Sequence, residues 1–254
     1  MLYNTYVNYI KMFVNSDINS WQFKSHPDYR YMLEHVSAEQ GYKYLSEITH
    51  KFNLIYNANK DYFIELCHKN DLCGKPEMHN FTNFSLCSPS NLRYILHSLL
   101  ILSYMKKCML NNIDVVEIGG GYGGLCFFIY KLAHLFDISI NTYSIFDLQA
   151  PLMVQKKYLE NLNIINLNYV ELDDFKNIKE NSFLISNYAF SEISLDLQKR
   201  YTTSVLNPYI SHGFLAWNNI DVYNFIDNKN IAIENEIPLT GPKNKYVSFK
   251  PNTD

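Results

Sequence analysis

The pattern of apolar positions along the chain changes near Asn111. Before this point apolar residues recur at the spacing of amphipathic helices, and after it short β-rich runs alternate with helical stretches. This alternation is typical of a parallel sheet with crossover helices. The pattern therefore predicts a helical N-terminal region over residues 1–110, followed by an α/β domain over residues 111–254.

Two helices stand out in the N-terminal region. One begins at Ser37, because Ser37 and Gln40 have the spacing of a capping box. Its apolar face, which must pack against another element, consists of Tyr44, Leu45, Ile48 and Phe52. The other begins at Ser88–Ser90, and its apolar positions nearly encircle it, which indicates a buried helix. Those positions are Leu92, Ile95, Leu96, Leu99, Leu100 and Leu102.

The α/β domain is predicted to contain a sheet of seven strands. These are Val115–Ile118, Asn141–Phe146, Asn166–Glu171, Phe183–Ser186, Phe214–Asn218, Ile231–Glu236 and Lys245–Lys250. Helical periodicity lies between them at Gly123–Phe136, Pro151–Glu160 and Leu195–Ile210. The last two strands leave no room for a helix, so they should form an antiparallel hairpin across Pro238–Lys243.

Composition and charge narrow the classes of protein. The chain has 254 residues, of which 47% are hydrophobic and 19% charged, which excludes disorder and provides a core. Its net charge of −3 offers no positive field for nucleic acid. The longest apolar stretch, Ile95–Met105, is too short to span a bilayer, and the N-terminus lacks a secretory pattern. We therefore expect a cytoplasmic protein with no membrane anchor.

The five cysteines are odd in number and form no Cys-x-x-Cys pair. This usage is typical of buried thiols in a reducing compartment. A metal site at Cys67, His68 and Cys73 would lack the paired spacing that zinc sites show. We therefore predict no metal at these residues.

The sharpest motif is the strand Val115–Ile118, which runs into the glycine-rich turn Gly119–Gly124 and then into a helix. Glycines permit positive φ angles and close approach to a ligand, and a helix N-terminus offers unpaired N–H groups. A nucleotide-like ligand is the expected occupant, and a purely structural turn is the alternative. The glycines fit both the dinucleotide pattern G-x-G-x-x-G and the pattern G-x-G-x-G.

Acidic residues near the turn favour one of these two patterns. A carboxylate at Glu117 would repel a pyrophosphate, whereas it suits a cationic cofactor. The second strand ends in Asp147–Leu148, where an acid can accept hydrogen bonds from both hydroxyls of a ribose. Asp173 and Asp174 follow the third strand, and solvated loop acids are the alternative for them.

Four segments of the α/β domain resemble class I S-adenosylmethionine-dependent methyltransferases, and in particular the family of sugar O-methyltransferases. They are Val116–Gly124, Ile145–Leu148, Gln155–Leu159 and Ile185–Glu192. Upstream, His26–His35 and Ser88–Tyr94 are similar to the helical N-terminal region of that family. The resemblance spans nearly the whole chain.

The resemblance implies a Rossmann-like class I methyltransferase fold, with a seven-stranded, mostly parallel sheet that ends in an antiparallel hairpin. In this family an acid and its neighbour after the third strand flank the adenine, and the residues after the fourth strand lie beside the transferred methyl group. S-adenosylmethionine is the implied cofactor and S-adenosylhomocysteine its product. The expected cofactor-binding residues are Glu117, Gly119, Gly120, Gly121, Gly123, Asp147, Leu148, Asp173, Asp174, Asn187 and Tyr188.

Glu192 is the candidate catalytic base, because it follows the fourth strand and a sugar hydroxyl is a poor nucleophile. The alternative is a helix-start carboxylate that the helix dipole stabilises. Asn218, Asn219 and Asp221 could join Glu192 around a divalent cation. Turn-forming asparagine is the simpler explanation, so no metal is predicted.

Arg93 is the candidate substrate-binding residue, because a guanidinium can hold a cofactor carboxylate or a sugar-linked phosphate. A surface arginine is the alternative. Four histidines can reach a cleft from loops or from the N-terminal region, although a structural role is more typical for each. They are His26, His79, His97 and His212.

The sequence therefore predicts a methyltransferase that methylates a hydroxyl of a sugar, on a nucleotide-linked sugar or a glycan, with residues 1–110 selecting the acceptor. Two rivals remain open. One is an NAD-dependent oxidoreductase on a nucleotide sugar, against which Glu117 and the terminal hairpin argue. The other is a non-catalytic scaffold with a methyltransferase fold. For the assembly, both a homodimer and a part of a larger glycan-modifying protein stay open.

Overall fold

The computed structural model describes residues 2–252, which form two compact units. The first unit contains the chain up to Ser103 together with Gly121–Phe136 and Met153–Ile165. The second contains Tyr104–Gly120, Asp137–Leu152 and the chain from Asn166 onward. The predicted functional division at residue 110 stays a prediction.

The second unit is built on a seven-stranded sheet in the order β5-β4-β3-β6-β7-β9-β8. Five neighbouring strands are parallel, and β9 pairs antiparallel with both β7 and β8. The bounds are β3 (Ile113–Ile118), β4 (Ile140–Asp147), β5 (Leu167–Glu171), β6 (Ser182–Asn187), β7 (Ile210–Trp217), β8 (Lys229–Asn235) and β9 (Lys245–Pro251). This topology confirms the predicted Rossmann-like class I methyltransferase fold.

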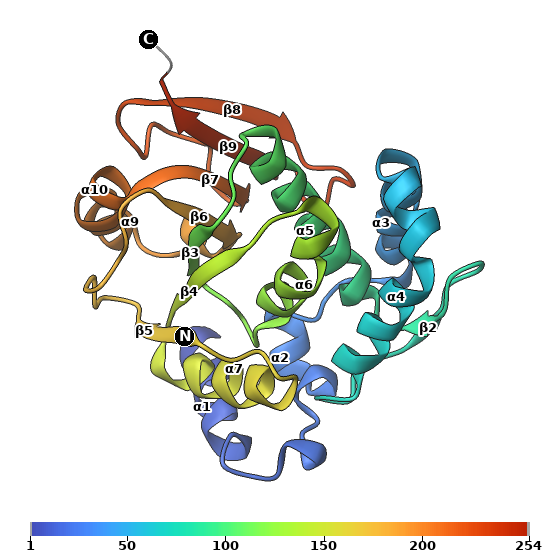
Figure 1. Cartoon of the computed structure of the whole chain (residues 1–254). Helices are drawn as coiled ribbons and strands as arrows, with labels where there is room; N and C mark the ends of the chain where they lie inside the picture. The colour runs from blue at the N-terminus through green and yellow to red at the C-terminus, as the bar shows by residue number, and fades with distance from the viewer. Residues whose placement is uncertain (1, 253–254) are drawn as a thin grey trace. The chain divides into compact units, whose positions relative to one another are not determined.

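All seven predicted strands are present, and β8 and β9 form the predicted antiparallel hairpin (Figure 1). The largest shift is in β7, which begins at Ile210 rather than at Phe214. Its first residues include the polar pair Ser211 and His212, so the apolar pattern indicates a strand only from Phe214. Pairing with β6 makes them part of the strand, since His212 lies opposite Phe183.

The predicted helix over Leu195–Ile210 is interrupted. It consists of α9 (Leu195–Tyr201), a π-helical segment (Thr202–Leu206) and the short α10 (Asn207–Tyr209). These segments form a hydrophobic core with one another, with the sheet and with the loop after β7. The core contains Val116, Ile118, Phe146, Leu184, Phe190, Tyr201, Val205, Leu206, Ile210, Leu215, Trp217, Phe225, Ile226, Val247 and Phe249.

The first unit is mainly helical. Its helices are α1 (Leu2–Phe13), α2 (Pro27–Met32), α3 (Ala38–Lys51), α4 (Asn53–Asp71), most of α5 (Pro89–Lys107) and α6 (Gly124–Leu132). The helix α7 (Gln149–Asn161) begins in the second unit and ends in the first, and α8 (Ala189–Glu192) belongs to the second. A two-stranded ribbon that the sequence pattern did not predict, β1 (His79–Asn80) with β2 (Leu86–Cys87), precedes α5.

Both predicted N-terminal helices are confirmed. The capping box at α3 is complete, because the Ser37 hydroxyl accepts from Gln40 N and Ser37 N donates to Gln40 Oε1. The predicted apolar face of α3 is buried, and so are all the predicted apolar positions of α5 except the half-buried Leu100. Burial of these faces explains why the two helices form.

In the first unit, a buried polar network holds Tyr122, which is one residue of the glycine-rich turn. The Lys24 amino group donates to the Asn70 backbone oxygen at 2.8 Å and lies 4.3 Å from the centre of the Tyr122 ring. The Asn70 amide donates to the Tyr122 hydroxyl and to Asn91, and the Tyr158 hydroxyl donates to Asn70 Oδ1. These groups are buried, so the hydrogen bonds among them replace hydrogen bonds to water. A large desolvation penalty is thereby avoided.

No helix within residues 2–252 is long and apolar enough to cross a membrane. The cysteines are free thiols, of which Cys108 is half-buried and the other four are buried.

The capping box generates a prediction for stability. Replacing Ser37 with Ala removes the acceptor for Gln40 N and should lower the free energy of unfolding by about 1 kcal/mol, measured by urea titration with circular dichroism. The matched control is Ser46→Ala, an exposed position in the middle of the same helix, where alanine should be neutral or slightly stabilising. Equal unfolding midpoints for the two variants would contradict the capping role.

Candidate functional site

The chain reverses its order across the sheet between β3 and β6. From β3 it continues to β4 and β5 on one side, and it returns to β6 on the other side. In open parallel sheets such a reversal leaves a ligand-binding position at the carboxyl ends of the two strands. The residues that follow β3 are Gly119 and Gly120, and those that end β6 and follow it are Asn187 and Tyr188.

The loops after β3 and β6 meet at this position. Gly119 has a φ of +77°, and a Cβ atom on it would lie 2.1 Å from the Ala189 Cβ, so only glycine fits there. The Ser186 hydroxyl donates to the Ile118 backbone oxygen and accepts from Phe190 N. Ser186 is fully buried, and the sequence analysis missed it because one serine in an apolar strand gives no signal.

The turn from Gly121 onward belongs to the first unit. Gly123 has a φ of +100° and stands at the N-cap of α6, where no side chain caps the helix. The Gln155 amide donates to the Gly121 backbone oxygen at 2.9 Å. Tyr122, between these two glycines, is held by the polar network described above. Gln155 and the polar network around Tyr122 therefore hold the part of the turn that lies in the first unit.

Glu117 lies in β3 and is 1% exposed. Its Oε2 accepts a hydrogen bond from the Tyr143 hydroxyl of β4 at 2.9 Å. Burial raises the pKa of Glu117 to about 8, the hydrogen bond from Tyr143 opposes the shift, and the charge of Asp147 adds to it. The negative charge expected from the sequence is therefore largely suppressed at neutral pH unless a positive charge lies nearby.

The acids after β4 and β5 occupy more open positions. Asp147 is half-buried, lies opposite Glu171 in the pairing of β4 with β5, and accepts from Leu148 N at 2.8 Å. Asp173 and Asp174 are both exposed, and Asp174 lies 3.9 Å from Lys176. Asp147 and Asp173 lie close enough to Tyr201 to reinforce the increase in its pKa that burial causes. The structure therefore gathers Glu117, Asp147 and Asp173 at the carboxyl edge of the sheet.

Glu192 is exposed at the end of α8. The Asn218 amide, which follows β7, donates to Glu192 Oε1 at 2.6 Å. Ser191 in turn donates to Asn218 Oδ1 at 2.7 Å, and its hydroxyl accepts from Asn218 N. Asn218 therefore orients the Glu192 carboxylate. Asn187, another of the predicted site residues, is half-buried at the end of β6.

Tyr188 is held by a group that the sequence analysis did not single out. It has a φ of +68°, which is unusual for a residue other than glycine, and its N donates to the Ala216 backbone oxygen. Its hydroxyl donates to Glu236, a carboxylate that is 1% exposed and also accepts from Thr240 and Asn244. This network ties the residue after β6 to the loop of the β8–β9 hairpin.

The remaining candidate residues are Arg93 and three of the histidines. Arg93 belongs to the first unit, is 7% exposed and donates to the Leu33 backbone oxygen at 3.1 Å, so the surface alternative is wrong. His97 is buried in α5, and His26 stacks on Tyr9. His212 lies near the amino end of β7, which is the opposite edge of the sheet from the acids.

Two residues of the divalent-cation hypothesis, Asp221 and Asn218, contact other protein groups. Asp221 is mostly exposed and pairs with Lys243 at 3.2 Å, while the side chain of Asn218 is engaged with Ser191 and Glu192. Within the described part of the chain, no three His, Cys, Asp or Glu side chains are grouped so that they could hold a metal ion.

No protein-family model and no curated protein sequence matches the chain. Solved structures with similar architecture include a variant of MtNAS in complex with S-adenosylmethionine, which is 14% identical, with coverage of 100% of this chain and 99% of that chain and a TM-score of 0.44. Another is M. capricolum TrmK in complex with S-adenosylhomocysteine, at 17% identity, coverage of 60% and 68%, and a TM-score of 0.39. Similarity at this level assigns neither ligand nor activity.

The unusual environment of Glu117 generates a prediction about pH. Because its pKa is raised in the folded state from 4.5 to about 8, its contribution to stability is present below pH 4.5 and is lost as the pH rises to 8. The free energy of unfolding of the wild type should therefore fall between pH 5 and pH 8 relative to that of Glu117→Gln, in urea titrations. Glu180→Gln, at an exposed position, is the control, and a pH-independent difference between wild type and Glu117→Gln would contradict the assignment.

Proposed function

We propose that the protein is an S-adenosylmethionine-dependent methyltransferase that methylates a hydroxyl of a sugar, on a nucleotide-linked sugar or a glycan. The observation that carries the proposal is the set of acids at the carboxyl edge of the sheet, beside the glycine turn. Glu117 and Asp147 lie there at the ends of neighbouring strands, and Asp173 follows the next one. Acids in this arrangement suit a cationic ligand with ribose hydroxyls, and they disfavour a pyrophosphate.

The chain's own residues fit this cofactor in charge and in hydrogen bonding. Asp147 offers a carboxylate whose Oδ1 already accepts from Leu148 N, which fixes its orientation for two vicinal hydroxyls. Glu117 can regain its negative charge when a positive charge is brought close, since its raised pKa reflects burial rather than a fixed partner. When bound, the sulfonium supplies an activated methyl group for in-line displacement.

Methyl transfer to a hydroxyl also needs a group that accepts the hydroxyl proton. Glu192 is proposed for this role because its carboxylate is exposed at the end of α8 and is oriented by the Asn218 amide. Asn218 would act as a positioning residue. The Ser191 hydroxyl holds Asn218 in place, because it donates to the side-chain oxygen of Asn218 and accepts from the backbone N–H of Asn218. Asn187 and Tyr188, at the end of β6, are proposed to line the same reaction site, with Tyr188 fixed by Glu236.

The sugar acceptor is proposed because the motif segments resemble those of sugar O-methyltransferases. The small net charge of the chain, −3, is compatible with a neutral acceptor. The residues upstream of 111 are proposed to select it.

The cofactor assignment is tested by calorimetric titration with S-adenosylmethionine, S-adenosylhomocysteine and NAD. We expect the first two to bind and NAD not to bind. Asp147→Asn should weaken binding of S-adenosylhomocysteine at least about ten-fold, because it removes a charged acceptor, whereas Glu180→Gln at an exposed site should leave binding unchanged. Binding of NAD alone would favour the oxidoreductase, and cofactor binding without turnover on any sugar would favour a scaffold.

The role of Glu192 is tested by Glu192→Gln, assayed by transfer of labelled methyl groups to a panel of nucleotide sugars and glycans. Loss of a general base should lower kcat by about 10²–10⁴-fold and leave the affinity for S-adenosylhomocysteine unchanged. Asp196→Asn, at an exposed acid of the next helix, is the matched control. Unchanged kcat in Glu192→Gln would show that another group accepts the proton.

A further inference from the structure

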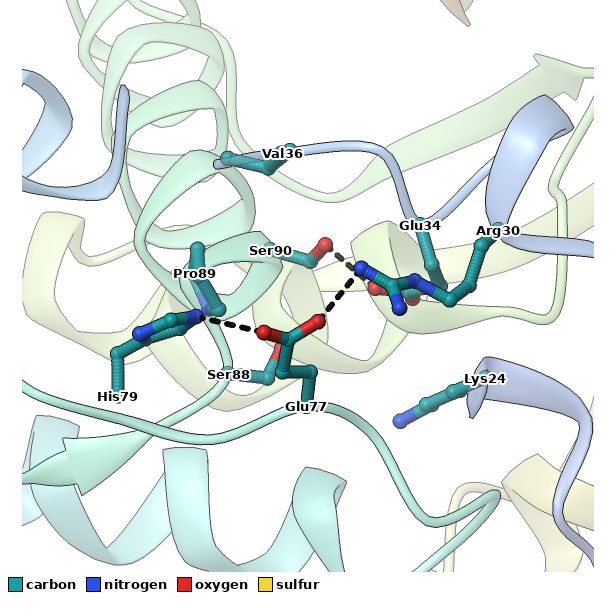
Figure 2. Close-up of a pocket in the computed structure, with 9 residues that line it drawn as sticks. All are labelled: Lys24, Arg30, Glu34, Val36, Glu77, His79, Ser88, Pro89 and Ser90. Atoms are coloured by element: carbon teal, nitrogen blue, oxygen red, sulfur yellow. Dashed lines mark hydrogen bonds and ion pairs between the residues drawn. The ribbon is translucent and has the colours of Figure 1, made fainter. Parts of the chain in front are cut away.

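A small polar pocket lies in the first unit at the amino end of α5 (Figure 2). Its volume is about 20 Å³, which is room for one water-sized group. Its lining comes from α2 and the segments on either side of it, from the segment around β1, and from the start of α5. The residues are Lys24, Arg30, Glu34, Val36, Glu77, His79, Ser88, Pro89 and Ser90.

Two buried polar atoms in this lining have no hydrogen-bond partner among the described residues. Glu34 is 8% exposed, and its Oε2 accepts from the Ser90 hydroxyl while its Oε1 has no partner. Ser88 is 2% exposed, and its Oγ also has no partner. Buried polar atoms are rarely left without partners, so an acceptor and a hydroxyl that line the same small space indicate a polar guest.

The charges around the pocket identify the chemistry of that guest. The cations Lys24 and Arg30 are balanced by the carboxyl groups of Glu34 and Glu77, so the pocket offers no net positive charge to a phosphate. The charge of Lys24 acts on Glu34 and partly offsets the increase in its pKa that burial causes. A neutral hydroxyl, which can donate to Glu34 and also accept, matches this mixed lining better than an anion does.

Two of the lining residues, Arg30 and Glu77, are exposed. Arg30 and Glu77 form an ion pair there, with His79 Nε2 at 3.4 Å from the other Glu77 oxygen (Figure 2). Both side chains of the ion pair are about half exposed, at 47% and 52%. Ion pairs this exposed contribute little to stability, so they can part to admit the remainder of a sugar ring.

The segment that carries Glu34 also contacts the part of the glycine turn that lies in the same unit. Leu33 precedes Glu34, and a Cβ atom on Gly121 would lie 3.7 Å from Leu33 Cδ1. The Arg93 guanidinium donates to the Leu33 backbone oxygen, so Arg93 positions the segment that carries Glu34. Arg93, which is predicted from the sequence to bind substrate, therefore has a structural role beside Glu34.

We propose that this pocket is a subsite for one hydroxyl group of a neutral sugar, which donates to Glu34 Oε1 and hydrogen-bonds to Ser88 Oγ. The inference rests on the proposed function, because it assigns the sugar acceptor a binding position.

The test is saturation-transfer NMR with the methyl glycosides of glucose, galactose, mannose, xylose, rhamnose and fucose, and with inorganic phosphate followed by ³¹P line width. We expect saturation transfer to at least one glycoside in the wild type. Glu34→Gln should weaken that glycoside's binding about ten-fold, because the Ser90 hydroxyl would hold the amide oxygen and turn the NH₂ group into the pocket. Glu39→Gln, an exposed glutamate of α3, is the matched control and should bind as the wild type does.

Ser88→Ala provides a second variant that keeps the fold. Its Oγ has no partner among the described residues, so its removal should leave the melting temperature unchanged while it weakens glycoside binding several-fold. No transfer to any glycoside, equal binding by Glu34→Gln and wild type, or broadening of phosphate alone would each overturn the proposal. Cofactor titration separates the two failures, since S-adenosylmethionine can bind normally when this subsite is wrong.

Discussion

The close approach of the loops after β3 and β6 is the constraint on which the candidate site depends. A single serine hydroxyl, that of Ser186, connects the last carbonyl of β3 to the start of α8, and Gly119 leaves the space that Ala189 occupies. A side chain at residue 119 would push these loops apart. Ala189 and Phe190, which make this contact, lie between Tyr188 and Glu192 in the chain.

The acids at the carboxyl edge of the sheet differ in how their charges behave, because they differ in burial. Glu117 is fully buried, so its proton is held up to a pKa of about 8 and its charge depends on what lies nearby. Asp147 is half-buried and is oriented by the backbone N–H of Leu148. Asp173 and Asp174 are exposed, so solvent screens them strongly. Burial therefore distinguishes one carboxyl group, whose charge depends on what lies near it, from others that are accessible to solvent.

Buried hydrogen-bond networks support both units in the same way. In the first unit, Lys24 and Asn70 hold Tyr122 of the glycine turn, and in the second, Glu236 holds Tyr188. Each network places a polar group where removal of one partner would leave a buried donor or acceptor unsatisfied. Such networks fix the orientation of the loop residues Tyr122 and Tyr188.

The sequence by itself determined the order and type of the strands in the α/β part of the chain, because hydrophobic periodicity and glycine placement are local. All seven strands, the terminal hairpin, the capping box at Ser37 and the glycine turn could be predicted in this way. Local patterns could not predict Ser186, Glu236 or the unpartnered oxygen of Glu34, since each is defined by partners far away in the sequence. The tertiary structure alone decided which polar groups are buried, and burial sets both the pKa of Glu117 and the lining of the pocket at α5.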